Sequence, residues 1–167
     1  MISILSRWPF RRITKARRYA MPNICLTFGT TTAATKLLDA LTTLDGLAGW
    51  WTNDTSGNPA QGGTVTFTFG GNGGFDMQVI KSDARQVHWE CIKGPDDWLG
   101  TRIEFDIEAH DSHNQVMFRH AGWNSENPFF HHCSTKWATF LLSLRDYVET
   151  GEGRPFPNDI KIEASGM

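Results

Sequence analysis

The chain has 167 residues, of which 40% are hydrophobic and 20% are charged, a balance typical of one globular domain and unlike that of disordered or collagenous chains. No stretch approaches the roughly 20 apolar residues of a membrane-spanning helix, so stable membrane insertion is not expected. Residues 21–167 contain ten basic and eighteen acidic residues. Because this negative charge disfavours binding to phosphate backbones, we expect no nucleic-acid partner.

The first twenty positions hold the other six basic residues and no acid. We interpret residues 1–21 as a basic, unstructured leader or an over-extended start upstream of Met21, although an organelle transit peptide has the same composition. The opening MISIL is too short for the core of a secretory signal. Residues 22–158 form the predicted domain, and residues 159–167 a C-terminal tail.

Three cysteines are widely spaced and form no CxxC pair: Cys25, Cys91 and Cys133. Their odd number and their spacing argue against a disulfide framework or a structural zinc site. We therefore expect reduced, buried thiols and a cytoplasmic location.

The first elements in chain order are one strand and two helices. Residues 23–28 are rich in strand formers and end at a glycine. Thr32 is the expected N-cap of a helix whose leucines recur at helical spacing, and Asp45 is the expected N-cap of a short second helix that carries Trp50 and Trp51.

From Thr64 onward apolar and polar residues alternate, which predicts an antiparallel sheet with one buried and one wet face. The alternation covers at least five segments, namely residues 64–69, 75–79, 87–91, 103–107 and 116–120. The glycine-rich residues 70–74 lie between the first two. Because a strand and not a helix follows them, we interpret them as a hairpin turn and not as a phosphate-binding loop.

A long helix is predicted at the end of the chain. Asn127 is its expected cap, Pro128 lies in its first turn, and Gly151 ends it after Thr150. Its apolar residues fall on one stripe, which comprises Phe130, Cys133, Trp137, Phe140, Leu141, Leu144 and Val148. The apolar face of the sheet is the only surface large enough to cover this stripe, so the predicted fold class is α+β.

Four segments carry a resemblance to a known family: TLDGLAGWW, GPDDWLGTRIEFDI, RHAGW and WATFLLSLRDYVETGEGRPFP. With the order of elements, they resemble the SRPBCC superfamily, also called START-like or helix-grip, and within it the group related to the activator of the heat-shock chaperone ATPase. The resemblance implies a curved antiparallel sheet wrapped around the long C-terminal helix. It also implies a cavity between them, in which members of the superfamily bind lipids, polyketides and other apolar molecules.

The expected ligand-binding residues are mostly aromatic side chains on the inward register of the sheet and on the helix stripe. They are Trp51, Phe67, Phe69, Met77, Trp89, Phe105, Phe118, His120, Cys133, Trp137 and Phe140. His120 is the one ionisable group on the inward register. It could be a satisfied histidine at the cavity rim, bonded to backbone or to Trp123, a group that orients a ligand, or a catalytic base.

No metal, cofactor or catalytic residue is expected. On a helix, His131 and His132 point to opposite sides of Cys133, so the three cannot chelate one ion. His110 and His113 lie in a predicted hairpin loop, and this pair lacks two further ligands.

The leading hypothesis is therefore a non-enzymatic module that holds a small hydrophobic or aromatic molecule in a cavity almost free of charge. One alternative is a cyclase or hydrolase of the polyketide-cyclase branch, which needs a second polar group beside His120. The other is a chaperone cofactor or stress-response protein that binds a protein partner or forms a weak homodimer. This alternative predicts an exposed apolar patch around Trp98, Trp123 and Phe156.

Overall fold

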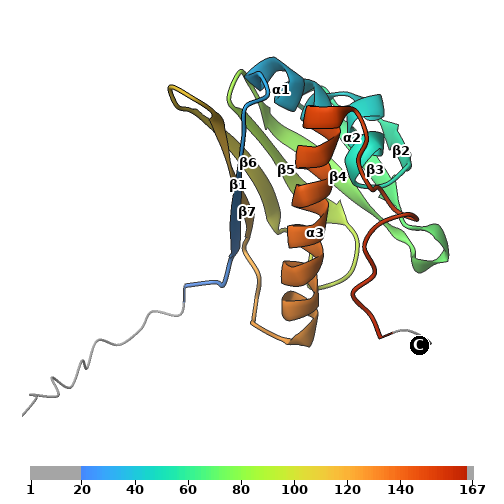
Figure 1. The fold of residues 1–167 in the computed structure, drawn as a ribbon. Helices are drawn as coiled ribbons and strands as arrows, with labels where there is room; N and C mark the ends of the chain where they lie inside the picture. The colour runs from blue at the N-terminus through green and yellow to red at the C-terminus, as the bar shows by residue number, and fades with distance from the viewer. Residues whose placement is uncertain (1–19, 165–167) are drawn as a thin grey trace, which may run out of the picture.

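The computed structural model describes residues 20–164. A seven-stranded antiparallel sheet holds one long helix against its concave face, and two short helices lie beside the C-terminal end of that helix (Figure 1). In chain order the elements are β1 (Ile24–Thr30), α1 (Ala34–Thr42), α2 (Leu44–Trp50), β2 (Asp54–Gly57), β3 (Thr64–Thr68), a 3-10 turn (Gly70–Asn72), β4 (Gly74–Ser82), β5 (Gln86–Lys93), β6 (Arg102–Ala109), β7 (Asn114–Ala121) and α3 (Pro128–Thr150). This is the predicted α+β helix-grip fold. Residues 1–19 of the expected leader lie outside the described part of the chain.

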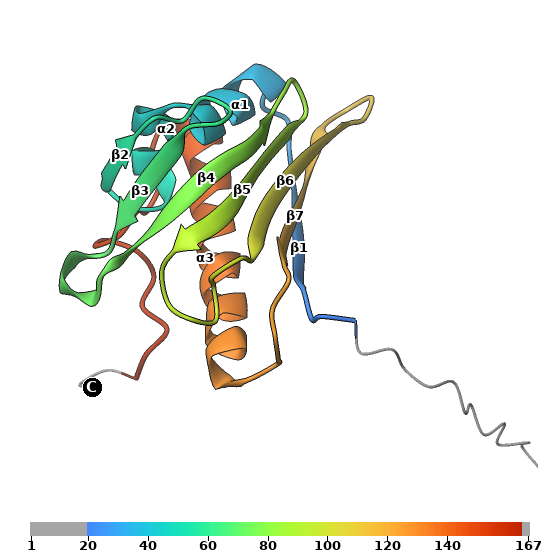
Figure 2. The ribbon, with the colours of Figure 1, turned by 180° about the vertical axis from the view of Figure 1, so that it is seen from behind.

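The strand order is β1-β7-β6-β5-β4-β3-β2, so the five predicted strands form a meander and β1 closes it beside β7 (Figure 2). Strand β2 was not expected, because its residues DTSG are small and polar and carry no alternation. It pairs with β3 and forms the second edge of the sheet. Among residues 20–164, no helix combines the length and the hydropathy needed to cross a membrane.

The register of the sheet brings large apolar side chains together on the face that meets α3. Phe105 lies opposite Phe118 on the neighbouring strand, with 5.2 Å between their ring centroids. Trp50 meets Phe105 edge-on from α2. All seven residues of the predicted helix stripe are buried. At about 2 kcal/mol for each large side chain removed from water, burial of this stripe makes a large favourable contribution to stability.

The ends of α3 follow the sequence prediction. The side chain of Asn127 accepts a hydrogen bond from the backbone N–H of Phe130, and Gly151 ends the helix with a φ of 86°, in the left-handed region. This conformation costs a glycine little, because it has no Cβ.

The predicted caps of the two short helices were wrong. Helix α1 begins one residue later than expected, with Ala33 at its N-cap, and Thr32 does not cap it. Helix α2 is capped by Thr43, whose hydroxyl accepts a hydrogen bond from the backbone N–H of Gly46. Asp45 lies inside its first turn, where a carboxylate interacts favourably with the helix dipole.

The chain after α3 turns back and descends beside the helix (Figure 1). Ser143 of α3 holds this segment and α2 together. Its hydroxyl donates a hydrogen bond to the carbonyl of Trp50 at the end of α2 and accepts one from the N–H of Arg154. Phe156 then exchanges backbone hydrogen bonds with Trp51 and Asn53. The C-terminal segment therefore lies against the residues that join α2 to β2.

Candidate ligand-binding site

A pocket of about 1190 Å³ lies where the first half of α3 faces the β3–β4 hairpin, the β5–β6 loop and the C-terminal segment. Its walls contain eight aromatic side chains: Trp51, Phe69, Phe75, Trp98, Phe129, Trp137, Phe140 and Phe156. The volume is slightly larger than that of typical small-molecule sites. The curved sheet and the helix diverge here, and side chains line the space without filling it.

The aromatic rings of the pocket form continuous walls. Phe75 stacks on Trp98 with 4.1 Å between ring centroids, and Trp98 is nearly parallel to Trp137 at 6.0 Å. Trp51 lies 5.0 Å from Trp137. Each ring is held by another ring or by the core, so little side-chain entropy remains to be lost when a ligand binds.

The predicted ligand-binding residues divide into two groups. Five line the pocket, namely Trp51, Phe69, Cys133, Trp137 and Phe140. The other six do not line it and are buried in the packed interior: Phe67, Met77, Trp89, Phe105, Phe118 and His120. These six residues pack against one another and against the core, whereas the pocket lies toward the start of α3.

Sequence reasoning missed four aromatic wall residues, Phe75, Trp98, Phe129 and Phe156. Phe75 alternates in phase with Met77, and this signal could have placed it on the inner face. Trp98 and Phe156 come from irregular segments, where no periodicity indicates direction. The exposed patch expected around Trp98, Trp123 and Phe156 was wrong, because the two tryptophans are 4% and 0% exposed and Phe156 is half-buried.

His120 is fully buried, and both of its ring nitrogens have partners. The indole Nε1 of Trp137 donates to Nδ1 across 3.1 Å. Because an indole N–H can only donate, Nδ1 is an acceptor and the proton of the neutral ring is on Nε2. Nε2 lies 2.8 Å from the hydroxyl of Thr101, which donates in turn to the carbonyl of Trp98.

The environment of His120 favours its uncharged form. Burial lowers the pKa of His120 to about 3, because the surrounding apolar side chains cannot solvate an imidazolium. Trp123 contacts the ring at 4.8 Å without a hydrogen bond to it. His120 therefore links α3, β7 and the β5–β6 loop, and it does not face the pocket.

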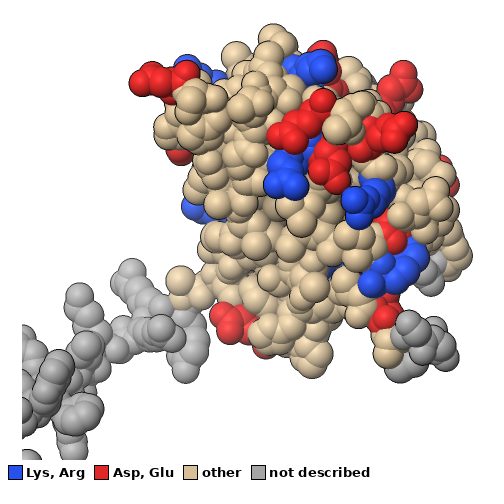
Figure 3. Space-filling view, in the orientation of Figure 1, with Lys and Arg blue, Asp and Glu red and all other residues tan. Residues whose placement is uncertain are grey.

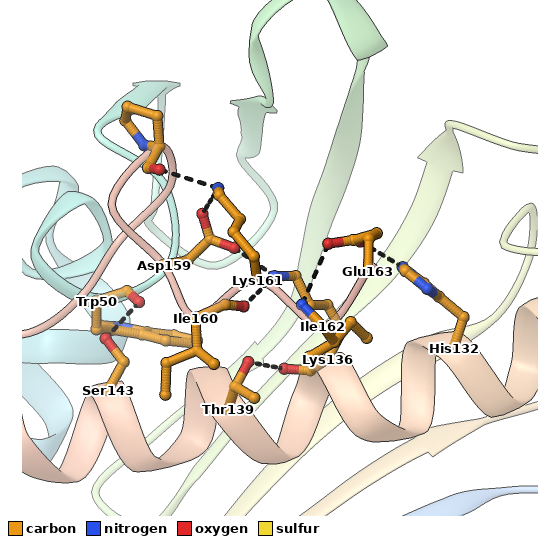
Figure 4. Close-up of polar contacts among 11 residues, drawn as sticks. Trp50, His132, Lys136, Thr139, Ser143, Asp159, Ile160, Lys161, Ile162 and Glu163 are labelled. Carbon is orange, nitrogen blue, oxygen red and sulfur yellow. Dashed lines mark hydrogen bonds and ion pairs between the residues drawn. The ribbon is translucent and has the colours of Figure 1, made fainter. Parts of the chain in front are cut away.

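The mouth of the pocket is charged, which corrects the expectation of a cavity almost free of ionisable groups. Lys93, Lys136 and Lys161 line it together with Asp159 and Glu163. Asp159 accepts hydrogen bonds from Lys136 and Lys161, while Glu163 lies 3.9 Å from His132 (Figure 4).

Opposing effects act on the carboxyl group of Asp159. Burial favours its neutral form, but hydrogen bonds from Lys136 and Lys161 and the charges of these two residues together hold its pKa below the ordinary value. Asp159 is therefore a carboxylate at neutral pH, and it compensates the charge of Lys136 at the edge of the aromatic pocket.

The other ionisable groups of the sheet lie on its convex face, as in the pair of His88 and Asp106 at 2.9 Å. His110 and His113 stack on each other in the β6–β7 loop. Within residues 20–164, no group of three or more His, Cys, Asp or Glu side chains could hold a metal ion.

The fold and part of the sequence recur in known structures. No protein-family model matches the sequence, and neither does any curated protein. The solved structure of the Aha1 dimer from Colwellia psychrerythraea is 42% identical, covers 80% of this chain and 100% of that chain, and superimposes with a TM-score of 0.73.

More distant structures share only the fold. SSP2350 from Staphylococcus saprophyticus is 14% identical, with a TM-score of 0.66 and coverage of 80% of this chain and 97% of that chain. CalU16 from Micromonospora echinospora is also 14% identical, with a TM-score of 0.63 and coverage of 75% and 73%. Because the likeness to the Colwellia Aha1 extends over the whole of that chain, this protein belongs to the Aha1-related group of the SRPBCC, or START-like, superfamily.

Proposed function

We propose that the protein binds a small, flat, apolar molecule in the aromatic pocket and does not transform it chemically. The observation that supports this most directly is the pair of nearly parallel indoles, Trp98 and Trp137, in the wall of a space of about 1190 Å³. Aromatic faces in the wall favour a planar ligand, which can stack on them.

Apolar contact is the expected source of affinity. Each 100 Å² of ligand surface removed from water contributes about 2.5 kcal/mol before the cost of immobilisation is subtracted. The eight aromatic side chains of the walls supply this contact, and the charged groups lie only at the mouth.

The state of His120 favours binding over catalysis. A general base needs a free nitrogen within reach of its substrate and a pKa near the working pH. Both nitrogens of His120 already have partners, and its pKa of about 3 leaves it a weak base. These contacts weigh against the cyclase or hydrolase alternative.

Binding can be tested by NMR with N-phenyl-1-naphthylamine, a neutral probe with a flat aromatic body. We expect the indole N–H signals of Trp51, Trp98 and Trp137 to shift, because these side chains line the pocket. The signal of Trp50 should stay, since this side chain does not line the pocket. No saturable shift of the three pocket indoles would contradict the proposal.

A matched pair of variants tests whether the probe binds in this pocket. Phe69→Ala removes a half-buried wall of the pocket and should weaken binding of the probe by about tenfold, the effect of losing roughly 1.4 kcal/mol of contact. Ile80→Ala truncates a side chain that is 37% exposed and not in the pocket, and it should leave the affinity unchanged.

The second candidate is a cytoplasmic protein-interaction role, as a chaperone cofactor or stress-response protein. It is supported by the relative of 42% identity, which was solved as a dimer of Aha1. The convex face of the sheet also carries three exposed apolar residues, Ile80, Ile92 and Met117. Sedimentation equilibrium tests self-association, and Ile92→Asp should shift a dimer toward monomer if this face is the contact.

A further inference from the structure

Lys136 lies where the apolar pocket meets solvent. Its ammonium is 5.3 Å from the ring centroid of Phe140, and only 18% of its side chain is exposed. An ammonium so far removed from water requires an anionic partner. Asp159 is that partner, and only 2% of its side chain is exposed (Figure 4).

The segment that carries Asp159, residues 155–164, is here called the strap. Phe156 fixes its beginning by packing on Phe69 at 5.5 Å and by its backbone bonds. Among the described residues, the polar contacts that join residues 158–164 to the rest of the domain reach only Lys136 and His132 on α3. Ile160 is 40% exposed. The far part of the strap therefore depends on the contact of Asp159 with Lys136.

The strap resembles a ligand in its chemistry. It places an aromatic ring, Phe156, on the pocket wall and a carboxylate, Asp159, on the lysine at the mouth. Basic groups intermix with acidic ones on the side of the molecule where the strap descends (Figure 3). Three of the ten basic residues after position 20 line this one pocket, although that part of the chain is net acidic.

We propose that the pocket selects amphipathic acids, whose apolar body lies on the aromatic walls and whose acid group takes the place of Asp159 at Lys136. The strap is then a built-in competitor that an acid displaces. This inference rests on the proposed function and specifies its ligand class. A neutral ligand that displaced Asp159 would leave the ammonium of Lys136 without a partner, whereas an acid restores the charge-assisted hydrogen bond.

Two probes that share an apolar skeleton test whether the pocket prefers acids. Both contain the N-phenylnaphthylamine skeleton, and 8-anilinonaphthalene-1-sulfonate adds an acid group that N-phenyl-1-naphthylamine lacks. Fluorescence titration of the full chain should give tighter binding of the sulfonate, by about tenfold or more, as expected for a hydrogen bond between charged groups. Lys136→Met should abolish this preference, so that the two probes bind the variant with similar affinity.

The competing role of the strap is tested with Asp159→Asn. We expect this variant to bind the sulfonate more tightly by about tenfold, because Lys136 no longer has an internal carboxylate partner. Glu152→Gln removes the same charge from the exposed turn before the strap, outside the pocket, and should change the affinity less than about twofold, because exposed charges are screened. Thermal unfolding of each variant checks that the domain is intact.

The outcomes separate this inference from the proposed function. If Asp159→Asn lowers the affinity for both probes to the same extent, the strap is a wall of the pocket and not a competitor, and the inference is overturned. An unchanged preference for the sulfonate in Lys136→Met overturns it as well. If neither probe binds any variant, the proposed function fails and the inference fails with it. Displacement of the sulfonate by decanoate at lower concentration than by decanol, or by 2-naphthoate at lower concentration than by 2-naphthol, supports the inference and shows whether an aliphatic or an aromatic acid is preferred.

Discussion

The indole Nε1 of Trp137 donates a hydrogen bond to Nδ1 of His120 across 3.1 Å, and this bond joins α3 to β7 inside the core. It fixes the tautomer of the imidazole and directs the proton on Nε2 toward Thr101. A histidine without a neighbouring carboxylate thus has a structural role: it satisfies two buried polar side chains beside the pocket.

Acid should unfold the protein through His120. Because the folded-state pKa of His120 is about 3 and the unfolded value is about 6.5, the unfolded chain binds an extra proton between these limits. The free energy of unfolding is unaffected by this group above pH 6.5, and it falls as the pH drops below that value, by at most about 4–5 kcal/mol at pH 3. Urea unfolding at a series of pH values between 7.5 and 4.5 measures the loss.

His120→Gln is the control for this acid sensitivity. A glutamine amide can accept from Trp137 and donate to Thr101, but it does not titrate. The free energy of unfolding of the wild type minus that of the variant should therefore be constant above pH 7 and decrease below pH 6. A difference that stays constant down to pH 4.5 would show that His120 is protonated as readily in the folded state as in the unfolded one.

The three thiols should differ in reactivity. The sequence predicted buried thiols, and this was wrong for Cys25, which is exposed on β1. Burial raises the pKa of Cys91 to about 11 and that of Cys133 to about 12, so neither forms much thiolate at pH 8. Ellman's reagent should label one cysteine quickly in the folded protein and three in denaturant. Rapid labelling that persists in Cys25→Ser would contradict this.

The contact between α2 and α3 should tolerate no side chain at Gly49. A Cβ built there would lie 2.3 Å from the half-buried ring of Tyr147, so either this ring would have to shift or the two helices would have to separate. We expect Gly49→Ala to lower the free energy of unfolding by about 1–3 kcal/mol, the usual cost of overpacking.

Gly71→Ala is the matched control for this helix contact. A Cβ at Gly71 meets no atom within 4 Å, and the position is exposed in the turn between β3 and β4. Its free energy of unfolding should stay within about 0.5 kcal/mol of the wild-type value. Equal losses for the two variants would mean that the close approach of α2 to α3 does not limit stability.

The sequence alone predicted most of the fold, because the strong signals lie in regular elements. Alternation revealed the five strands of the meander, and the 3.6-residue period with Asn127 and Gly151 revealed α3 from end to end. Strand β2 was missed, since a short edge strand of small polar residues has no face to bury. The cap at Asp45 was misplaced because Thr43, two residues earlier, offers the same chemistry, whereas Thr32 was wrong because Ala33 is the N-cap of α1 and no side chain caps that helix.

The pocket was harder to predict than the fold. Periodicity shows which side chains face inward, but it does not show which of them pack solidly. Phe105 and Phe118 face the interior just as Phe69 and Phe140 do, yet only the latter pair line the pocket. The charged mouth depends on Asp159 returning to α3 from an irregular segment, and no local pattern indicates such a contact.

The cap of α3 should also support the pocket. The side-chain oxygen of Asn127 accepts from the N–H of Phe130 at 2.9 Å, and its amide donates to Asp97 at 3.0 Å, next to Trp98. Asn127→Ala loses both bonds and should lower the free energy of unfolding by about 1–2 kcal/mol. Asn127→Ser keeps a cap but is too short to hold Asp97, so it should cost less stability.

These two variants separate helix capping from the position of the loop. Both release the β5–β6 loop that carries Trp98, so both should weaken binding of N-phenyl-1-naphthylamine to a similar extent, although their midpoints of urea unfolding differ. If the affinity instead follows stability, with Asn127→Ser close to wild type, the bond to Asp97 does not position the pocket wall. A wild-type affinity in both variants leads to the same conclusion, because Trp98 is then held by its other contacts, such as its stacking on Phe75 and Trp137.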